Sequence, residues 1–175
     1  PHKFVGKKSD VWLKNFLTPE SMSYTAEKPM NGFPKGTRVM PSSLYPDYEV
    51  APVLDNTADK ASLGWRNRAW ASTERPDPHW IEFALPEAQP VSEVKVVWAT
   101  DNGEAFPSRR FEVQVQAKAE SQWETVWKTD ENLSKSTVAS FSPREVQKIR
   151  VVQEPEGGSS ARPNLMWVEQ VAIAR

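Results

Sequence analysis

The chain has 175 residues, enough for one β-sandwich of about 150 residues but not for two separate hydrophobic cores. Hydrophobic residues make up 38% and charged residues 26%, which is typical of a globular chain, and the absence of cysteine excludes disulfides and thiol catalysis. The formal net charge of -1 and the lack of any run of about 18 apolar residues argue against nucleic acid as a partner and against membrane insertion.

The first 37 residues show no regular alternation of apolar and polar side chains. Lysines precede Trp12 and Phe16, and Asp10 is suited to cap a short helix that carries both aromatic residues. We interpret residues 1–37 as a linker or N-terminal arm. Residues 38–175 are then the folded domain.

The clearest predicted strand covers residues 111–117, where apolar side chains alternate with Glu, Gln and Lys. Loops rich in Pro, Gly, Asn, Asp and Ser separate the predicted strands, and no segment after residue 40 has the apolar spacing of a three-turn helix. The expected fold is therefore an all-β, antiparallel β-sandwich. Further strands are predicted at residues 80–85, 94–98, 123–127, 138–141, 147–152 and 166–173.

Two segments, Pro-Ser-Ser-Leu-Tyr-Pro-Asp-Tyr-Glu at 41–49 and Val-Leu-Asp-Asn at 53–56, resemble the start of discoidin domains, also called coagulation factor type C domains. In that family a Ser-Ser strand leads to a loop and an Asp-Gly step. The resemblance covers residues 38–175 and implies a jelly-roll sandwich of the galactose-binding-domain type, with ligand-binding loops at one end. Its bacterial members are mostly carbohydrate-binding modules similar to family 32. Later matching segments are Trp70–Ser72, His79–Phe83, Val94–Trp98, Phe111–Gln116, Trp123, Lys148–Val151 and Glu169.

The resemblance also implies a structural calcium ion. Many bacterial members bind one through the Asp of the Asp-Gly step and a Glu in the last strand, positions that Asp55 and Glu169 match here. Asp59 could add a further oxygen to the six to eight that calcium requires. Asn56 replaces the usual Gly, and the stretch to Trp65 is longer than in the family, so turn-capping aspartates without a metal remain an alternative.

A loop at residues 63–70 (Leu-Gly-Trp-Arg-Asn-Arg-Ala-Trp) lies where family 32 modules place aromatic and polar side chains against a sugar. Trp65 could stack on the C–H face of a pyranose. Arg66 and Arg68 could donate paired hydrogen bonds, which favours an acidic or unusual sugar. Trp70 is expected to fill the core, whereas for Trp65 a core position and a ligand-facing position are equally compatible with the sequence.

Three further loops contribute candidate sugar contacts. Galactose-binding members typically carry an Arg in the loop that spans residues 98–107 here, and its absence argues against simple terminal galactose. Asp101 and Asn102 remain candidates in that loop, although they could equally form a turn that needs no ligand. The other candidates are Tyr45, Arg162 and Asn164, the last two in a Gly-rich loop that could also be idle surface.

Catalysis is not expected from this chain. Of its two histidines, His2 is near the terminus, and His79 begins a predicted core strand, where its imidazole is expected to bond a loop carbonyl. No phosphate-binding, zinc-binding or nucleophile-elbow motif is present.

The sequence thus predicts a non-catalytic carbohydrate-binding module, attached to a secreted or periplasmic polysaccharide-degrading enzyme. Its partners would be a glycan and an adjacent domain, and its location extracellular, on the cell surface or periplasmic. The alternative is a structural or protein-interaction module that braces a neighbouring catalytic domain, with Trp12 and Phe16 in an exposed apolar patch.

Overall fold

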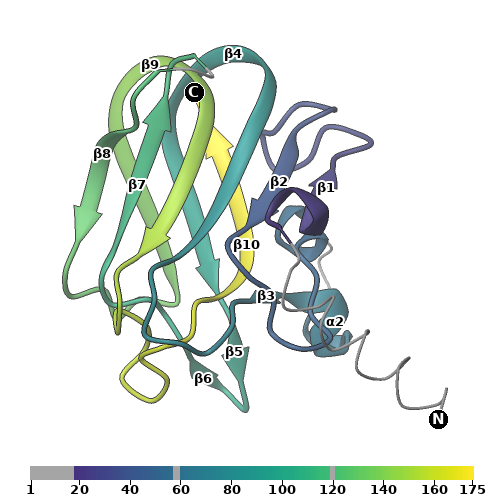
Figure 1. Ribbon diagram of the computed structural model, residues 1–175, viewed down its shortest axis with the longest axis vertical. Helices are drawn as coiled ribbons and strands as arrows, with labels where there is room; N and C mark the ends of the chain where they lie inside the picture. Colours follow the sequence, from purple (N-terminus) through teal and green to yellow (C-terminus); the bar gives the residue numbers. More distant parts are fainter. Residues whose placement is uncertain (1–17, 57–59, 119–120) are drawn as a thin grey trace, which may run out of the picture.

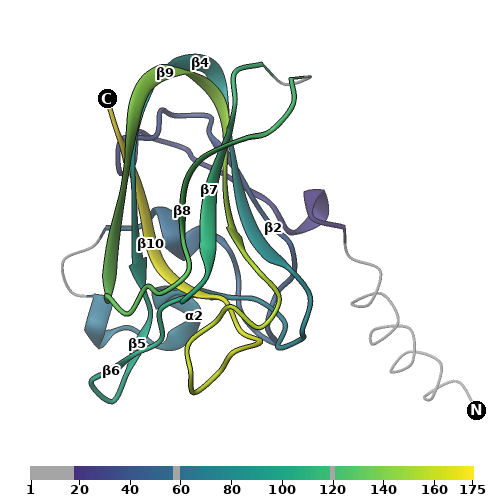
Figure 2. The ribbon, with the colours of Figure 1, turned by 90° about the vertical axis from the view of Figure 1, so that its left-hand side faces the viewer.

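Two long, paired strands organise the structure. It is a computed structural model and describes residues 18–56, 60–118 and 121–175. Strands β4 (His79–Trp98) and β9 (Ser136–Gln153) run antiparallel and bend together, so that each contributes to both layers of a β-sandwich (Figures 1 and 2). Their pairing is interrupted between Ala84 and Gln89, where they pass from one layer to the other. The predicted antiparallel β-sandwich is confirmed.

The other strands extend the two halves of this pair. In the first layer the order is β1, β2, the first part of β4, the last part of β9, β7 and β8. In the second layer β3 pairs with β10, which pairs with the last part of β4. The strands are β1 (Tyr24–Thr25), β2 (Arg38–Pro41), β3 (Trp70–Ala71), β7 (Phe111–Gln116), β8 (Glu124–Thr129) and β10 (Trp167–Ala174), with a separate hairpin of β5 (Thr100–Asp101) and β6 (Glu104–Ala105).

Some strands that the sequence predicts as separate are joined into one long strand in the structure. Residues 80–85 and 94–98 are the two ends of β4, and residues 138–141 and 147–152 lie in the two halves of β9. In β4 the buried apolar side chains fall on odd positions from Ile81 to Val91 and on even positions from Val94. A second register shift, between Val91 and Glu93, changes the phase of the two-residue period, which makes one strand look like two.

The core lies between the layers and follows the alternation of the strands. Phe111, Val113 and Val115 of β7 are buried, while the side chains between them are partly exposed, as the sequence predicts. Trp70 is also fully buried, and its Nε1 donates a hydrogen bond of 3.0 Å to the carbonyl of Ser43. Burial of a large apolar side chain contributes about 1.5–3 kcal/mol, so these positions stabilise the sandwich directly.

The domain begins earlier than the predicted boundary at residue 38. Strand β1 pairs with β2, and the fully buried Phe33 stacks on Phe83 with the ring centroids 4.6 Å apart. Residues 24–37 are thus part of the sandwich. They escape a pattern-based prediction because they are held by one aromatic residue and a two-residue strand, without a repeating period. The remaining part of the predicted arm, residues 1–17, lies outside the described residues.

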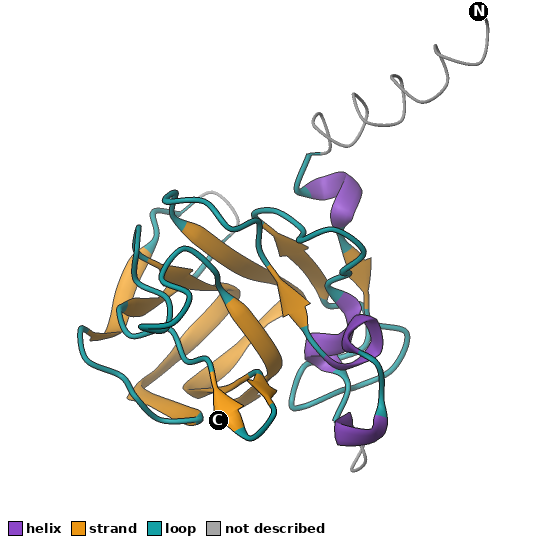
Figure 3. Cartoon of the chain, turned by 90° about the horizontal axis from the view of Figure 1, so that it is seen from below, coloured by secondary structure: helices purple, strands orange, loops and turns teal. Residues whose placement is uncertain are grey.

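Short helical turns flank the sheets on one side (Figure 3). No helix in the described part of the chain has the length and apolar character needed to cross a bilayer. The turns are η1 (Glu20–Met22), η2 (Ala51–Leu54), η3 (Lys60–Ser62) and α2 (Trp65–Arg68).

The contact of residues 29–34 with β10 can be tested at Gly32. Gly32 has a φ of +85°, and a Cβ there would lie 2.0 Å from the carbonyl oxygen of Ile173. Gly103 has a similar φ of +79°, but a Cβ there would meet no atom within 4 Å, so it is the matched control. We expect Gly103→Ala to cost about 1 kcal/mol from its left-handed backbone and Gly32→Ala about 2 kcal/mol more. Urea unfolding measures both values, and equal losses would contradict this packing.

Candidate ligand-binding site at the loop end

Five aromatic side chains gather at one end of the sandwich. This end carries α2 and the β5–β6 hairpin (Figure 1). The ring of Trp167, at the start of β10, lies 4.6 Å from that of Trp65 and 5.1 Å from that of Phe106, measured between centroids. Tyr45 and Tyr48 meet edge to face at 5.7 Å beside them. Trp167 is buried and the other four rings are half-buried. We call these five residues the loop-end cluster.

Small residues make room for the rings. Ala69, Ala71 and Ala99 are buried with Leu165 beneath the loop-end cluster. Helix α2 is a single turn that begins after the extended Gly64 and ends where Ala69 returns to extended backbone. This brief turn brings the ring of its first residue against β10 before the chain enters β3.

One ion pair between distant loops lies at the edge of the cluster. The guanidinium of Arg162 donates two hydrogen bonds to the carboxylate of Glu74, at 3.0 and 2.6 Å. Arg162 also lies 5.8 Å from the ring of Tyr45 and 6.0 Å from that of Trp167. The hydrogen bond from Arg162 lowers the pKa of Glu74, and the bond to Glu74 raises the pKa of Arg162. Both groups are therefore held in their charged forms.

A second polar group faces the cluster from the β5–β6 hairpin. Burial raises the pKa of Tyr48, and the nearby charge of Arg162 opposes this rise, while Asp101 adds to it. Asp101 is thus close enough to Tyr48 to share its electrostatic environment. Asn102, by contrast, is exposed at the hairpin tip with a φ of 49°. It has the left-handed backbone of a turn residue.

The structure gives the two arginines of α2 different surroundings. Arg66 is exposed and forms an ion pair of 3.3 Å with Asp47. Arg68 turns inward, donates to the hydroxyl of Thr100 at 2.8 Å, and lies 3.5 Å from the carboxylate of Glu169. It also covers the ring of Trp65 at 4.6 Å. Arg68 therefore supports the loop-end cluster from the side of β10.

Three buried polar atoms next to these loops have no hydrogen-bond partner in the described residues: the indole Nε1 of Trp167, the amide Oδ1 of Asn164 and Nε of Arg68, which makes only its 3.5 Å ion contact with Glu169. Such groups are rare in folded proteins, because the loss of water is not compensated. The backbone carbonyl of Asn164, unlike its side-chain oxygen, has a partner. This carbonyl and that of Arg75 each lie 2.9 Å from Nε2 of the buried His79, so the imidazole bonds loop carbonyls as predicted.

The structure thus brings Tyr45, Trp65, Asp101 and Arg162 together, whereas Arg66 and Asn102 lie on the exposed rim. Sequence reasoning missed Trp167, because it lies within a strand pattern that is typical of core positions. It also missed Glu74, Tyr48 and Phe106. The clustering of aromatic residues in several Pro- and Ser-rich loops was the available clue.

Two of the predicted calcium ligands, Asp55 and Glu169, lie near a lysine. Nζ of Lys60 donates to the carbonyls of Pro52 and Glu169, at 2.7 and 2.6 Å, and the side chain is buried. Burial lowers the pKa of Lys60, and the charges of Asp55 and Glu169 oppose that shift. Asp59 lies outside the described residues. In the described part of the chain, no three acidic or histidine side chains form a metal-binding group.

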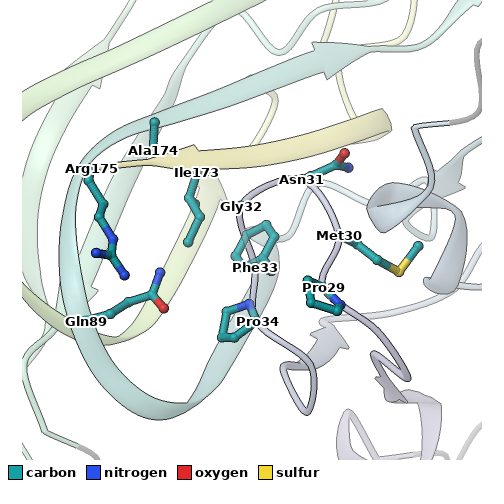
Figure 4. A pocket seen from close by; sticks show the side chains of 10 residues that line it. All are labelled: Pro29, Met30, Asn31, Gly32, Phe33, Pro34, Gln89, Ile173, Ala174 and Arg175. Atoms are coloured by element: carbon teal, nitrogen blue, oxygen red, sulfur yellow. The ribbon is translucent and has the colours of Figure 1, made fainter.

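A shallow cleft of about 560 Å³ lies elsewhere, between residues 29–34 and the end of β10 (Figure 4). Its walls include Phe33, Pro34 and Ile173, with Gln89 and Arg175 at one side. Trp167 and Ile173 lie near opposite ends of β10, and a strand rises about 3.3 Å per residue. The cleft is therefore remote from the loop-end cluster, and its walls carry no aromatic pair comparable to Trp65 and Trp167.

Solved structures share this fold. Chitosan-binding module 1 of a chitosanase/glucanase from Paenibacillus sp. IK-5 has 21% identity and a TM-score of 0.64, covering 83% of this chain and 96% of that one. The family 32 carbohydrate-binding module of C. perfringens NanJ, in complex with galactose, has 12% identity and a TM-score of 0.59, covering 89% and 96%. A GH29 fucosidase of Ruminococcus gnavus, in complex with fucose, has 11% identity and a TM-score of 0.62, covering 79% of this chain but 25% of that one.

No curated protein matches the chain. A family profile described as NedA-like, galactose-binding domain, of F5/8 type C, matches residues 55–151. This segment is more than half of the 175 residues and includes Trp65, the β5–β6 hairpin, strand β4 and all but the last two residues of its partner β9. The chain therefore belongs to the NedA-like galactose-binding domains of the F5/8 type C family.

Proposed function

We propose that this chain is a non-catalytic carbohydrate-binding module whose glycan site is the loop-end cluster. The observation that carries the proposal is the convergence of aromatic rings from four separate segments at the loop end. Family membership and the similar fold of known binding modules support it.

Aromatic rings suit this task for physical reasons. The C–H face of a sugar ring is apolar and packs on an indole or phenol ring, while the sugar hydroxyls stay free for hydrogen bonds. Rings that are half-buried, like Tyr45 and Trp65, have already lost most of their side-chain freedom. Binding then requires little further ordering, which is the main entropic cost at such a surface.

Polar groups at the edge of the cluster can orient the sugar. Glu74 holds Arg162 through two of its nitrogens and Tyr45 also hydrogen-bonds the guanidinium, which leaves part of its five N–H donors for sugar hydroxyl groups. The carboxylate of Asp101 is an acceptor. Donors and acceptors in fixed positions select among sugars that differ in the direction of their hydroxyls.

Charge at the loop end favours a neutral or amino sugar. The expectation of an acidic sugar depended on free guanidinium groups. Arg162, Arg66 and Arg68 each have a carboxylate partner, Glu74, Asp47 and Glu169 respectively. Asp101 joins none of these pairs and would repel a sugar carboxylate. The proposed ligand is therefore a neutral or amino hexose unit rather than a uronic acid.

The cellular role follows from the same comparison. The GH29 fucosidase is about four times as long as the segment that this fold occupies, so the fold there is one part of a larger glycosidase. We propose that this chain likewise adjoins a polysaccharide-degrading domain of an extracellular, cell-surface or periplasmic protein, and holds that domain near its substrate. The alternative role as a structural or protein-interaction module rests on the missing galactose clamp and on Trp12 and Phe16. These two aromatic residues lie outside the described residues.

Removing the Trp65 ring should abolish most of the glycan affinity. Loss of a stacked ring costs about 1.5 kcal/mol, so Trp65→Ala should bind about tenfold more weakly or worse. The measurement is a glycan array with galactose, N-acetylgalactosamine, chitotriose and oligogalacturonate, followed by calorimetry with the strongest ligand.

Trp123→Ala is the matched control, since its ring stacks on Arg150 at 4.3 Å and lies outside the loop-end cluster. It should keep wild-type affinity, and circular dichroism should show both variants folded. Unchanged binding by folded Trp65→Ala would reject this site. Binding of oligogalacturonate alone would reject a neutral or amino sugar.

Affinity should also depend on the charge of Glu74. Its pKa in the folded protein lies below the ordinary value of 4.5, because the ionised form accepts hydrogen bonds from Arg162. The pair is therefore intact at neutral pH and is lost as the pH falls through the lowered pKa. Only then is Arg162 released.

We expect Glu74→Gln to weaken sugar binding a few-fold at pH 7 and to lower stability by less than about 1 kcal/mol, because the pair is partly exposed. Wild type and variant should converge in affinity as the pH falls through the lowered pKa of Glu74, because the wild-type carboxylate is then neutral as well. Fluorescence titration with chitotriose or galactose at a series of pH values below 7 measures this. A ratio of the two affinities that stays constant across the whole titration of Glu74 would show that Glu74 does not position Arg162.

A further inference from the structure

Two cationic side chains, Lys60 and Arg68, lie beside Asp55 and Glu169, two of the residues expected to bind calcium. Lys60 is 5% exposed, although lysine is seldom buried. Its Nζ lies 2.7 Å from the carbonyl of Pro52, in η2, and 2.6 Å from that of Glu169, in β10. These short bonds are typical of a charged donor. The bond to Glu169 joins two residues that lie 109 positions apart in the sequence.

A second cation completes the arrangement. Nε of Arg68 lies 3.5 Å from Oε1 of Glu169, and the exposed fractions of the two side chains are only 15% and 14%. Asp55 and Glu169 thus supply two negative charges near Lys60, while Lys60 and Arg68 supply two positive charges. A calcium ion carries the same charge of +2 as these two side chains together.

Calcium and the Lys60 ammonium also exclude each other sterically. Calcium binds oxygen at about 2.3–2.6 Å, nearly the distance that Nζ keeps from the two carbonyls. A calcium ion bound to those oxygens would coincide with Nζ. It would also face Lys60 and Arg68 at close range in a buried site, where like charges repel strongly.

We propose that Lys60, supported by Arg68, takes the place of a structural metal ion in this domain and makes its fold independent of calcium. The ammonium holds η2 against β10 as a bound ion would. This inference concerns stability and does not depend on the proposed glycan function.

The test compares wild type with Lys60→Ala and Lys60→Met. Thermal unfolding is followed in EDTA and in millimolar calcium chloride, and luminescence of terbium, a calcium substitute, reports a bound ion through nearby tryptophans. Wild type should unfold at the same temperature in both solutions, within about 1 °C, and give no sensitised terbium signal.

Both variants should unfold at least about 5 °C lower in EDTA, because two buried carbonyls and two carboxylates lose a cation. Calcium should restore part of this loss and terbium should bind in Lys60→Ala, where the space is free. Neither should occur in Lys60→Met, where the long side chain still fills it. If Lys60→Ala does not fold, the wild-type measurements and Lys60→Met still test the proposal.

Three results would overturn it. The first is wild type stabilised by several degrees in calcium. The second is a Lys60→Met variant as stable as wild type, which would make the ammonium dispensable. The third is a folded, destabilised Lys60→Ala variant that is not stabilised by calcium and gives no terbium signal. The place of Lys60 would then have no affinity for cations.

Discussion

The ladder of hydrogen bonds between β4 and β9 is the constraint on which the rest of the structure depends. The two strands stay paired on both sides of the bend, so the sandwich is one continuous sheet folded over itself (Figure 2). The pairs His79–Gln153 and Val97–Ser136 mark the same end of this ladder in the two layers. The loops that carry Glu74, Asp101 and Arg162 begin or end there, which is why side chains far apart in sequence meet.

Helix α2 connects the charged interior to the aromatic surface. Its first residue, Trp65, belongs to the loop-end cluster, and its last, Arg68, stacks on that ring and reaches Glu169. Lys60, in the turn before α2, bonds the carbonyl of the same Glu169. The position of the Trp65 ring is therefore set by cations that hold η3 and α2 against β10. A ring fixed in this way is a preorganised surface for a ligand.

The parts that the sequence predicts well are those determined by local pattern. The two-residue period identifies β7, and the burial of Trp70 and the carbonyl bonds of His79 follow from size and position alone. The site is predictable only in part, because the charge state and orientation of its polar groups depend on partners that are distant in the sequence. Arg162 and Glu74 are 88 residues apart, and no local pattern indicates that they neutralise each other. Without these partners in view, the arginines point to an acidic sugar.

Paired charges at the loop end change how a sugar can be selected. An exposed ion pair contributes little net energy, and salt screens it further, so Arg162 with Glu74 and Arg66 with Asp47 add little long-range attraction. Discrimination must then come from contact: the shape of the aromatic surface and the directions of a few donors and acceptors. A single sugar buries little apolar area on such a surface, so one site alone binds weakly. Useful affinity arises when the module and a catalytic domain in one protein bind the same polysaccharide, because the second contact is then intramolecular.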